Sequence, residues 1–218
     1  MLGRGEFLRL LFAELNVPYN EVMQGKSFQD GYGIQQEMKK SHTFFAIPAI
    51  EHGDIFLWQT PVMARYIALQ CDEGRLMPKN EKDDLYAQAL MATLVDVVGE
   101  GHDAWHSPDH NASYESQKES SALPIKIFIE KRLPKFFDFF ENSLKKNGNQ
   151  FFVGQSLSYV DVCMFHWLDG IEYQLPEVYQ QANIPTLREF KKRIAQRPNI
   201  AKRLETRTEK YDGTGPIF

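Results

Sequence analysis

Residues 44–68 read FFAIPAIEHGDIFLWQTPVMARYIA, which predicts a strand, a tight turn, a second strand and the start of a helix in immediate succession. The runs 49–50 and 55–57 are the β-favouring parts of this stretch. The polar residues 52–54 between them predict the turn, because Gly53 can adopt positive φ without strain. After the second strand, apolar side chains recur at helical spacing. The stretch therefore predicts an antiparallel β-hairpin followed directly by a helix with one buried face.

Two features of this stretch are suited to binding a ligand. Thr60 is expected to be the N-cap of the helix, with Pro61 at the first helical position. A helix start offers free N–H groups and the positive end of the helix dipole, which suit a carboxylate. Upstream, Pro48 interrupts the strand ladder, so a ligand could pair with the free backbone of Ile47. From these residues alone, an ordinary hairpin and a capped helix remain the simpler interpretation.

The bulk composition excludes several classes of protein. The chain has 218 residues, 43% of them hydrophobic, with 16 phenylalanines and a net charge of −4. There is no dense basic run for nucleic acid, no run of about 18 apolar residues for a membrane span and no signal-peptide pattern. Two cysteines cannot form a disulfide framework. We therefore expect a soluble cytoplasmic protein with no nucleic-acid or membrane partner.

The first third of the chain reads as mixed α and β structure. Apolar spacing predicts a helix over residues 7–15, and residues 19–23 read as a short strand. Residues 25–33 have a loop-like composition, and residues 34–40 could form one or two helical turns. The charged segment 72–82 then predicts a linker.

The rest of the chain reads as helical. Asn80 caps the first helix, residues 106–121 predict a loop or an irregular helix end, and Pro134 marks a kink or a new first turn in the next helix. Ser158 and Asp161 form a structural capping box. That box opens a helix apolar nearly all round. Three shorter helices are expected at 177–181, 186–196 and 200–209.

Three segments share a further pattern with one protein family. They are residues 3–10 (GRGEFLRL), Ile47-Pro48 together with Gln59-Thr60, and residues 152–161 (FVGQSLSYVD). In this order they resemble the cytosolic glutathione transferases, and most closely the sigma, mu and pi classes. The resemblance covers nearly the whole chain. It implies an α/β thioredoxin-like N-terminal domain (1–71), a linker (72–82) and an all-α helical domain (83–218).

The resemblance also implies roles for individual residues in binding glutathione. Thr60 and Gln59 would hold the γ-glutamyl carboxylate. Extended backbone at Ile47, set up by a cis Pro48, would pair with the cysteinyl unit. The glycyl carboxylate would meet Lys39 or Lys40.

A further ligand contact would cross a dimer interface. Asp96 lies where the family places a carboxylate that reaches the γ-glutamyl ammonium of the neighbouring subunit. This placement implies a homodimer. Glu100 or Asp103 could serve instead, and a solvated helix face would equally explain Asp96.

The chain departs from the family pattern in two places. The family often has Gln two residues before its proline, where this chain has Ala46, so one hydrogen bond to glutathione is missing. The family's first strand and its catalytic Tyr are also absent ahead of residue 3. Arg4 could provide part of the field that stabilises a thiolate. We hypothesise that Met1 is an internal methionine; if it is the true start, we expect glutathione binding with little conjugation.

Residues near the end of the first long helix suggest two possible sites. His102, His106 and His110 recur every four residues with Asp103 and Asp109 nearby, which could form a metal-binding helix face. No Glu or Cys completes a zinc pattern and Pro108 should end the helix, so no metal is expected. The family places the second-substrate pocket here, which assigns Trp105 and His106 to it.

The predicted function is that of a detoxifying glutathione transferase. It would add the thiolate of glutathione, its co-substrate, to small apolar electrophiles, without a covalent enzyme intermediate. A glutathione-dependent isomerase is the second enzymatic interpretation. A non-catalytic glutathione-binding or structural member of the fold is the third.

Overall fold

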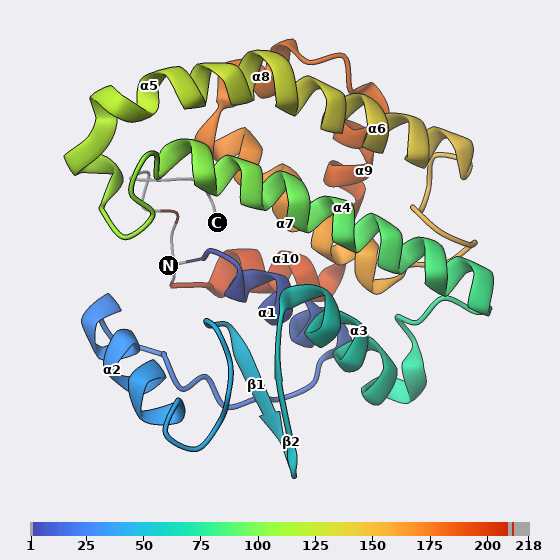
Figure 1. Cartoon of the computed structure of the whole chain (residues 1–218). Helices are drawn as coiled ribbons and strands as arrows, with labels where there is room; N and C mark the ends of the chain where they lie inside the picture. The colour runs from blue at the N-terminus through green and yellow to red at the C-terminus, as the bar shows by residue number, and fades with distance from the viewer. Residues whose placement is uncertain (1, 209–210, 212–218) are drawn as a thin grey trace.

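The computed structural model describes residues 2–208 and 211 (Figure 1). The N-terminal part contains α1 (Gly5–Leu15), α2 (Phe28–Met38), β1 (Ala49–His52), β2 (Ile55–Trp58), α3 (Thr60–Gln70) and the 3-10 turn η1 (Asp72–Gly74). The helical part contains α4 (Glu81–Trp105), η2 (Tyr114–Gln117), α5 (Lys118–Ile127), a π-helical turn η3 (Phe128–Arg132), α6 (Leu133–Lys146), α7 (Tyr159–Gln174), α8 (Pro176–Gln181), α9 (Pro185–Ala195) and α10 (Pro198–Thr206). No strand follows β2 in the described part of the chain.

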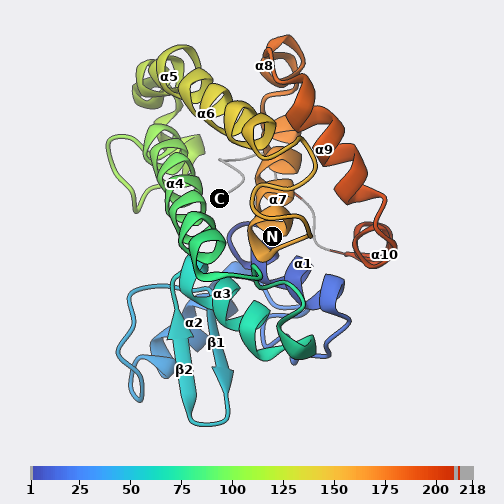
Figure 2. The ribbon, with the colours of Figure 1, turned by 90° about the vertical axis from the view of Figure 1, so that its right-hand side faces the viewer.

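The predicted hairpin forms. β1 and β2 pair antiparallel, with Ala49 opposite Trp58 at one end and His52 opposite Ile55 at the other. Gly53 adopts φ +63° in the turn, the region that favours glycine. The hairpin lies at the end of the molecule away from the helical bundle (Figures 1 and 2).

The helix after the hairpin begins one residue earlier than expected. The N-cap is Gln59, not Thr60, because the Gln59 carbonyl accepts the first helical hydrogen bond, from the Met63 N–H at 3.0 Å. Pro61 lies in the first turn, as predicted. Thr60 is therefore the first helical residue, and its backbone N–H is one of the groups that a helix start leaves free.

Two predictions for residues 19–40 are wrong. Residues 19–21 have no regular secondary structure and residues 22–25 form a turn, so no strand forms there. Among the described residues β1 and β2 pair only with each other, so this segment has no ladder to join. Residues 25–33 are not all loop, because Ser27 and Asp30 form a capping box that starts α2. The Ser-x-x-Asp spacing was the available signal for that helix.

α7 lies at the centre of the helical part (Figure 2). It packs against α1, α4, α8 and α9, and its side chains are buried on nearly every face. The prediction of a central apolar helix is confirmed. The buried side chains of α1, α3, α4, α6, α7 and α9 form one continuous cluster, so the core runs from the N-terminal part into the helical bundle.

The remaining helix predictions hold with shifted ends. Asn80 caps α4 by accepting from the Asp83 N–H at 2.9 Å, and Pro134 lies in the first turn of α6 rather than at a kink. The short helices predicted near the C-terminus correspond to α8, α9 and α10; residue 209 lies outside the described residues. Part of the segment expected as loop is helical, since α5 begins at Lys118.

Buried ion pairs fasten α1 to distant parts of the chain. Glu6 is fully buried and meets the Arg203 guanidinium of α10 at 2.8 Å. Glu14, also buried, pairs with Arg197 and with Arg75. Removing one partner of such a pair leaves a buried charge uncompensated. α1 is thereby fixed against both α10 and the segment after α3.

The capping box of α7 is buried. The Asp161 carboxylate accepts three hydrogen bonds, from the N–H and hydroxyl of Ser158, each at 2.7 Å, and from the Phe152 N–H at 2.8 Å. The Asp161 N–H faces the Ser158 carbonyl at 3.1 Å. Burial raises the pKa of Asp161 to about 6 while these donors oppose the rise. The Asp161 side chain therefore accepts hydrogen bonds both from the N-cap residue of α7 and from the segment before it.

We predict that this box stabilises the whole fold, whereas the similar box of α2 does not. Asp161→Ala leaves three buried donors without an acceptor and should lower the free energy of unfolding by about 3 kcal/mol or more. Ser158→Ala should cost about 1 kcal/mol. Asp30→Ala removes the same pairing at an exposed site and should cost about 1 kcal/mol or less. Urea denaturation measures all three; equal losses for Asp161→Ala and Asp30→Ala would contradict the prediction.

Candidate functional site

The strand register brings the two halves of the predicted ligand site together. Ala49 pairs with Trp58 at the open end of the hairpin. Pro48 directly precedes β1 and Gln59 directly follows β2 at this end, where antiparallel neighbours lie about 5 Å apart. Residues 47–48 and 59–60 therefore lie at the same end of the hairpin, although the hairpin itself separates them in sequence.

The backbone at Ile47 is free. The Ile47–Pro48 peptide bond is cis, as the resemblance implied. The Ile47 side chain is 43% exposed, and neither its N–H nor its carbonyl has a hydrogen-bond partner within residues 2–208 and 211. This backbone can accept an extended ligand by strand addition.

Backbone N–H groups at the start of α3 have no acceptor among the described residues. Gln59 has φ +73° and ψ 114°, a sparsely populated conformation for a residue with a side chain, and such strain costs about 1–3 kcal/mol. The N–H groups of Thr60 and Val62 have no acceptor in the described structure, nor does the Thr60 hydroxyl have a partner there. The Thr60 residue is 6% exposed, so only a small part of it can reach a ligand.

The two candidate lysines differ in their surroundings. The Lys40 ammonium pairs with Glu37 at 2.5 Å, and both side chains are 72% exposed. The Lys39 ammonium lies 5.7 Å from the centre of the buried Phe44 ring. Lys39 has no ion-pair partner in the part of the chain that the structure describes.

The three candidate carboxylates of α4 also differ. Glu100 is engaged by the Arg132 guanidinium through two hydrogen bonds of 2.6 Å. Asp103 lies 3.5 Å from His110 Nδ1. Asp96 is exposed, and no ion pair to it occurs among the described residues. Asp96 is therefore the carboxylate most available to a partner outside the chain.

Arg4 lies at the start of α1, in a partly buried position. Burial lowers the pKa of Arg4, and the negative charge of Asp103 opposes that change. The guanidinium stays protonated, because its ordinary pKa is above 12. It places a fixed positive charge between the start of α1 and the last turn of α4.

Trp105 is buried in the core. Its side chain is only 5% exposed and packs edge-on against Phe128, with ring centres 6.0 Å apart. It faces the core because it follows the buried stripe of α4 into the last turn. This burial argues against direct contact with a ligand.

The histidines near the end of α4 form a stack. The His106 ring lies on His102 with centres 4.5 Å apart, and its Nδ1 is 3.1 Å from the Ala112 carbonyl. His110 lies beyond, its ring centre 6.0 Å from His102. The pKa of His102 is lowered to about 4. Burial is the largest cause, and electrostatic interactions with His106 and Arg4 lower it further. The His102 ring is therefore neutral at neutral pH.

The cysteines provide no activated thiol. Burial raises the pKa of both Cys71 and Cys163. A raised pKa lowers the thiolate fraction, and the thiolate is the reactive form.

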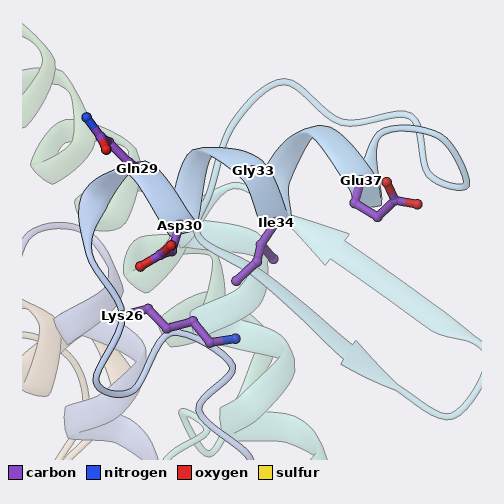
Figure 3. A pocket seen from close by; sticks show the side chains of 6 residues that line it. All are labelled: Lys26, Gln29, Asp30, Gly33, Ile34 and Glu37. Carbon is purple, nitrogen blue, oxygen red and sulfur yellow. The ribbon is translucent and has the colours of Figure 1, made fainter.

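Two cavities lie away from these residues. One of 660 Å³ runs along a face of α2 and is lined by Lys26, Gln29, Asp30, Gly33, Ile34 and Glu37 (Figure 3). Another of 450 Å³ lies between α1 and α10, with Tyr19, Asn199 and Lys202 in its lining. Neither includes a residue predicted to contact glutathione.

Sequence reasoning missed a polar network behind the start of α1. His166, fully buried in α7, lies with its Nε2 2.9 Å from the Gly3 carbonyl, next to Arg4. On its other side, the Tyr211 hydroxyl is 3.4 Å from Nδ1 and donates to Asp169 at 3.1 Å. A histidine in a helix otherwise apolar all round was the available signal. This network holds the start of α1 in place.

Comparisons with known proteins agree with the motifs. A family model described as the C-terminal domain of glutathione S-transferase matches residues 102–207. A glutathione S-transferase of Plasmodium yoelii yoelii is 27% identical over 95% of this chain and 90% of its own length. Glutathione S-transferase A4 of Bos taurus is 26% identical over 99% of this chain and 90% of its own length. Together these matches support a cytosolic member of the glutathione transferase family.

Solved structures confirm the family's fold. Prostaglandin synthase D of Nilaparvata lugens matches with a TM-score of 0.78 at 17% identity, covering 96% of each chain. A Pi-class glutathione S-transferase of Onchocerca volvulus matches with a TM-score of 0.77 at 20% identity, covering 98% of this chain and 95% of that one. The predicted fold class, a thioredoxin-like α/β domain with an all-α domain, is therefore confirmed. No helix in the described residues is long and apolar enough to cross a bilayer.

We predict that His166 makes the fold sensitive to acid. Burial lowers the pKa of His166, whereas the unfolded chain binds a proton there near pH 6.5. Below about pH 6.5 the unfolded state therefore holds more protons, and the free energy of unfolding falls as the pH falls. His166→Phe keeps an aromatic ring against Phe7 but cannot titrate.

The measurement is urea denaturation of both proteins from pH 7 to pH 5. The slope of unfolding free energy against pH should be smaller for His166→Phe than for the wild type. The exposed His52 provides the control, and His52→Gln should keep the wild-type slope. Identical slopes for all three proteins would disprove the assignment.

Proposed function

We propose that this chain binds glutathione at the open end of the hairpin and transfers its thiolate to small apolar electrophiles. The observation that supports this most is the strained Gln59 backbone beside the free peptide groups of Ile47. Strain at a non-glycine residue persists only where the surroundings impose it, and it is concentrated at functional sites. Gln59 immediately precedes α3, at the same end of the hairpin as Ile47.

The bound tripeptide would be held along its length. The cysteinyl unit pairs with the Ile47 backbone next to Pro48. The γ-glutamyl carboxylate meets the free N–H groups and hydroxyl at Thr60 and the Gln59 side chain, where the helix dipole also favours negative charge. Lys39, which lacks the Glu37 partner of Lys40, holds the glycyl carboxylate. Asp96 reaches the ammonium bound by the other subunit of a homodimer.

Catalysis consists of stabilising the thiolate and positioning it. The pKa of a free thiol is near 8.5. It must fall by about 2 units, which corresponds to about 2.7 kcal/mol, for the thiol to be mostly ionised at neutral pH. One hydrogen bond to a charged group provides about 1.5–3 kcal/mol. Arg4 is the residue we assign to this role. The sulfur then bonds to the electrophilic carbon, and any leaving group departs with the bonding electrons.

The remaining parts of the proposal follow the family. The division into residues 1–71, 72–82 and 83–218, the homodimer, the cytoplasmic location and a role in detoxification belong to it. Two alternatives use the same binding site without conjugation: a glutathione-dependent isomerase and a non-catalytic binder. Retention on immobilised glutathione, followed by a chlorodinitrobenzene assay, distinguishes conjugation from binding alone. A chain that is not retained would overturn every interpretation that requires glutathione and would leave only a structural member of the fold.

We predict that the Thr60 hydroxyl contributes directly to glutathione binding. Thr60→Val keeps the shape of the side chain and removes one hydrogen bond to a carboxylate. The dissociation constant, measured by calorimetry, should rise about tenfold to a hundredfold. Thr206→Val is the control, because that hydroxyl bonds to the Lys202 carbonyl of its own helix. Equal affinities for the two variants would remove Thr60 from the site.

We further predict that Asp96, and not Glu100, reaches the ligand. Asp96→Asn removes a charge that has no ion-pair partner within residues 2–208 and 211, and it should weaken glutathione binding about tenfold. Glu100→Gln should leave the affinity unchanged, because Glu100 is engaged by Arg132. Calorimetry with sedimentation analysis measures affinity and oligomeric state together. Weakening by Glu100→Gln alone would reverse the assignment.

A further inference from the structure

The last turn of α4 and the loop after it bring three metal-ligating side chains together. His102, Asp103 and His110 each contribute one ligand atom, and these atoms lie within 4.8 Å of one another. The Asp103 Oδ1 atom is central: His110 Nδ1 is 3.5 Å from it and His102 Nδ1 is 3.9 Å from it. None of these residues has a role in the proposed binding of glutathione.

From the sequence, His102, His106 and His110 could form one helical face with Asp103 nearby, but no metal is expected there. The observed grouping depends instead on the path of the loop after α4. α4 ends at Trp105, before Pro108, so His110 does not continue the helical face. The loop after α4 instead folds back and stacks the His110 ring parallel to His102, with an interplanar angle of 17°.

A buried glutamine holds the returning loop in position. Gln117 is 8% exposed. Its side chain accepts from the Asp109 N–H at 3.2 Å and donates to the carbonyls of Asp109 and Ala112, at 2.9 and 3.1 Å. The Ser121 hydroxyl reaches the Trp105 and Ser107 carbonyls. Supporting contacts of this kind fix the positions of ligand side chains. The backbone of His110 is therefore held in place even without a bound ion.

The distances suit a small transition-metal ion. Bonds of about 2.0–2.2 Å at tetrahedral angles separate ligand atoms by about 3.3–3.6 Å. The His110–Asp103 distance already lies in this range, and the other pairs close by rotation of side chains. Such rotation is available, since the side chains of Asp103 and His110 are 66% and 55% exposed. Three protein ligands leave a position for water.

The ligand chemistry selects the class of ion. Two imidazoles and one carboxylate suit Zn²⁺, Co²⁺ and Ni²⁺, whereas Mg²⁺ and Ca²⁺ prefer sites made of oxygen alone. The Asp103 charge offsets part of the charge of a dication, and the nearby Arg4, which interacts with both Asp103 and His102, opposes it. We propose that His102, Asp103 and His110 bind one divalent transition-metal ion, with Zn²⁺ the best match.

The test is calorimetric titration of the untagged full-length chain with zinc chloride in a buffer that does not bind metal. We expect one ion per chain. His110→Ala should raise the dissociation constant about tenfold or more, and His102→Ala combined with His110→Ala should abolish binding. Far-UV circular dichroism verifies the fold of each variant. Wild-type affinity in the double variant, or no binding by the wild type, overturns the proposal.

Two controls separate this site from adventitious zinc binding. His52→Ala removes an exposed histidine of the hairpin, and Cys71→Ser removes the partly exposed thiol; both variants should keep the wild-type affinity. Loss of binding in either places the ion elsewhere and overturns the proposal. Titration with Co²⁺ gives a second readout. Its visible absorption should show bound nitrogen and oxygen ligands in the wild type and should disappear in the double variant.

Discussion

The position of α7 is the constraint on which the other elements depend. Its start is fixed by a single buried carboxylate, Asp161, which satisfies the helix terminus and the Phe152 N–H at once. Its middle is fixed to the start of α1 through His166 and the Gly3 carbonyl. An unpaired polar group in such surroundings costs free energy, so both contacts restrict where the N-terminal part can lie against the helical bundle.

The buried charges of α1 restrict the same interface from the other side. Glu6 joins Arg203, and Glu14 joins Arg75 and Arg197. A buried ion pair is weak evidence for net stability, but a mismatched arrangement that leaves one charge unpaired is costly. These pairs therefore favour one orientation of α1. Through α1 they also set the position of Arg4, the residue that we assign to thiolate stabilisation.

The candidate glutathione site and the candidate metal site share a physical feature. In each, groups that bind a ligand are supplied by a segment that is itself held by nearby structure. The strand register aligns Ile47 with the start of α3, and Gln117 holds the loop that carries His110. Arg4 lies near the candidate metal site, since the negative charge of Asp103 interacts with it and its own charge lowers the pKa of His102. A cation bound at the histidines would raise the positive potential at the start of α1.

Features that depend on neighbouring residues in sequence were predictable from the sequence. The hairpin, the Asn80 cap, the Ser158–Asp161 box and the apolar α7 each follow from side chains a few residues apart, where propensity and capping act. The family and its fold followed from three short motifs in order.

Features that depend on distant partners were decided only by the tertiary structure. Residues 19–23 form no strand because no described strand lies beside them, and Trp105 enters the core because Phe128 packs there. Glu100 is engaged by Arg132, 32 residues away, and that distant contact is the reason we propose Asp96 as the ligand contact. Local sequence specifies local hydrogen bonds and helical faces, whereas burial and ion pairing depend on which chain segments the fold brings together.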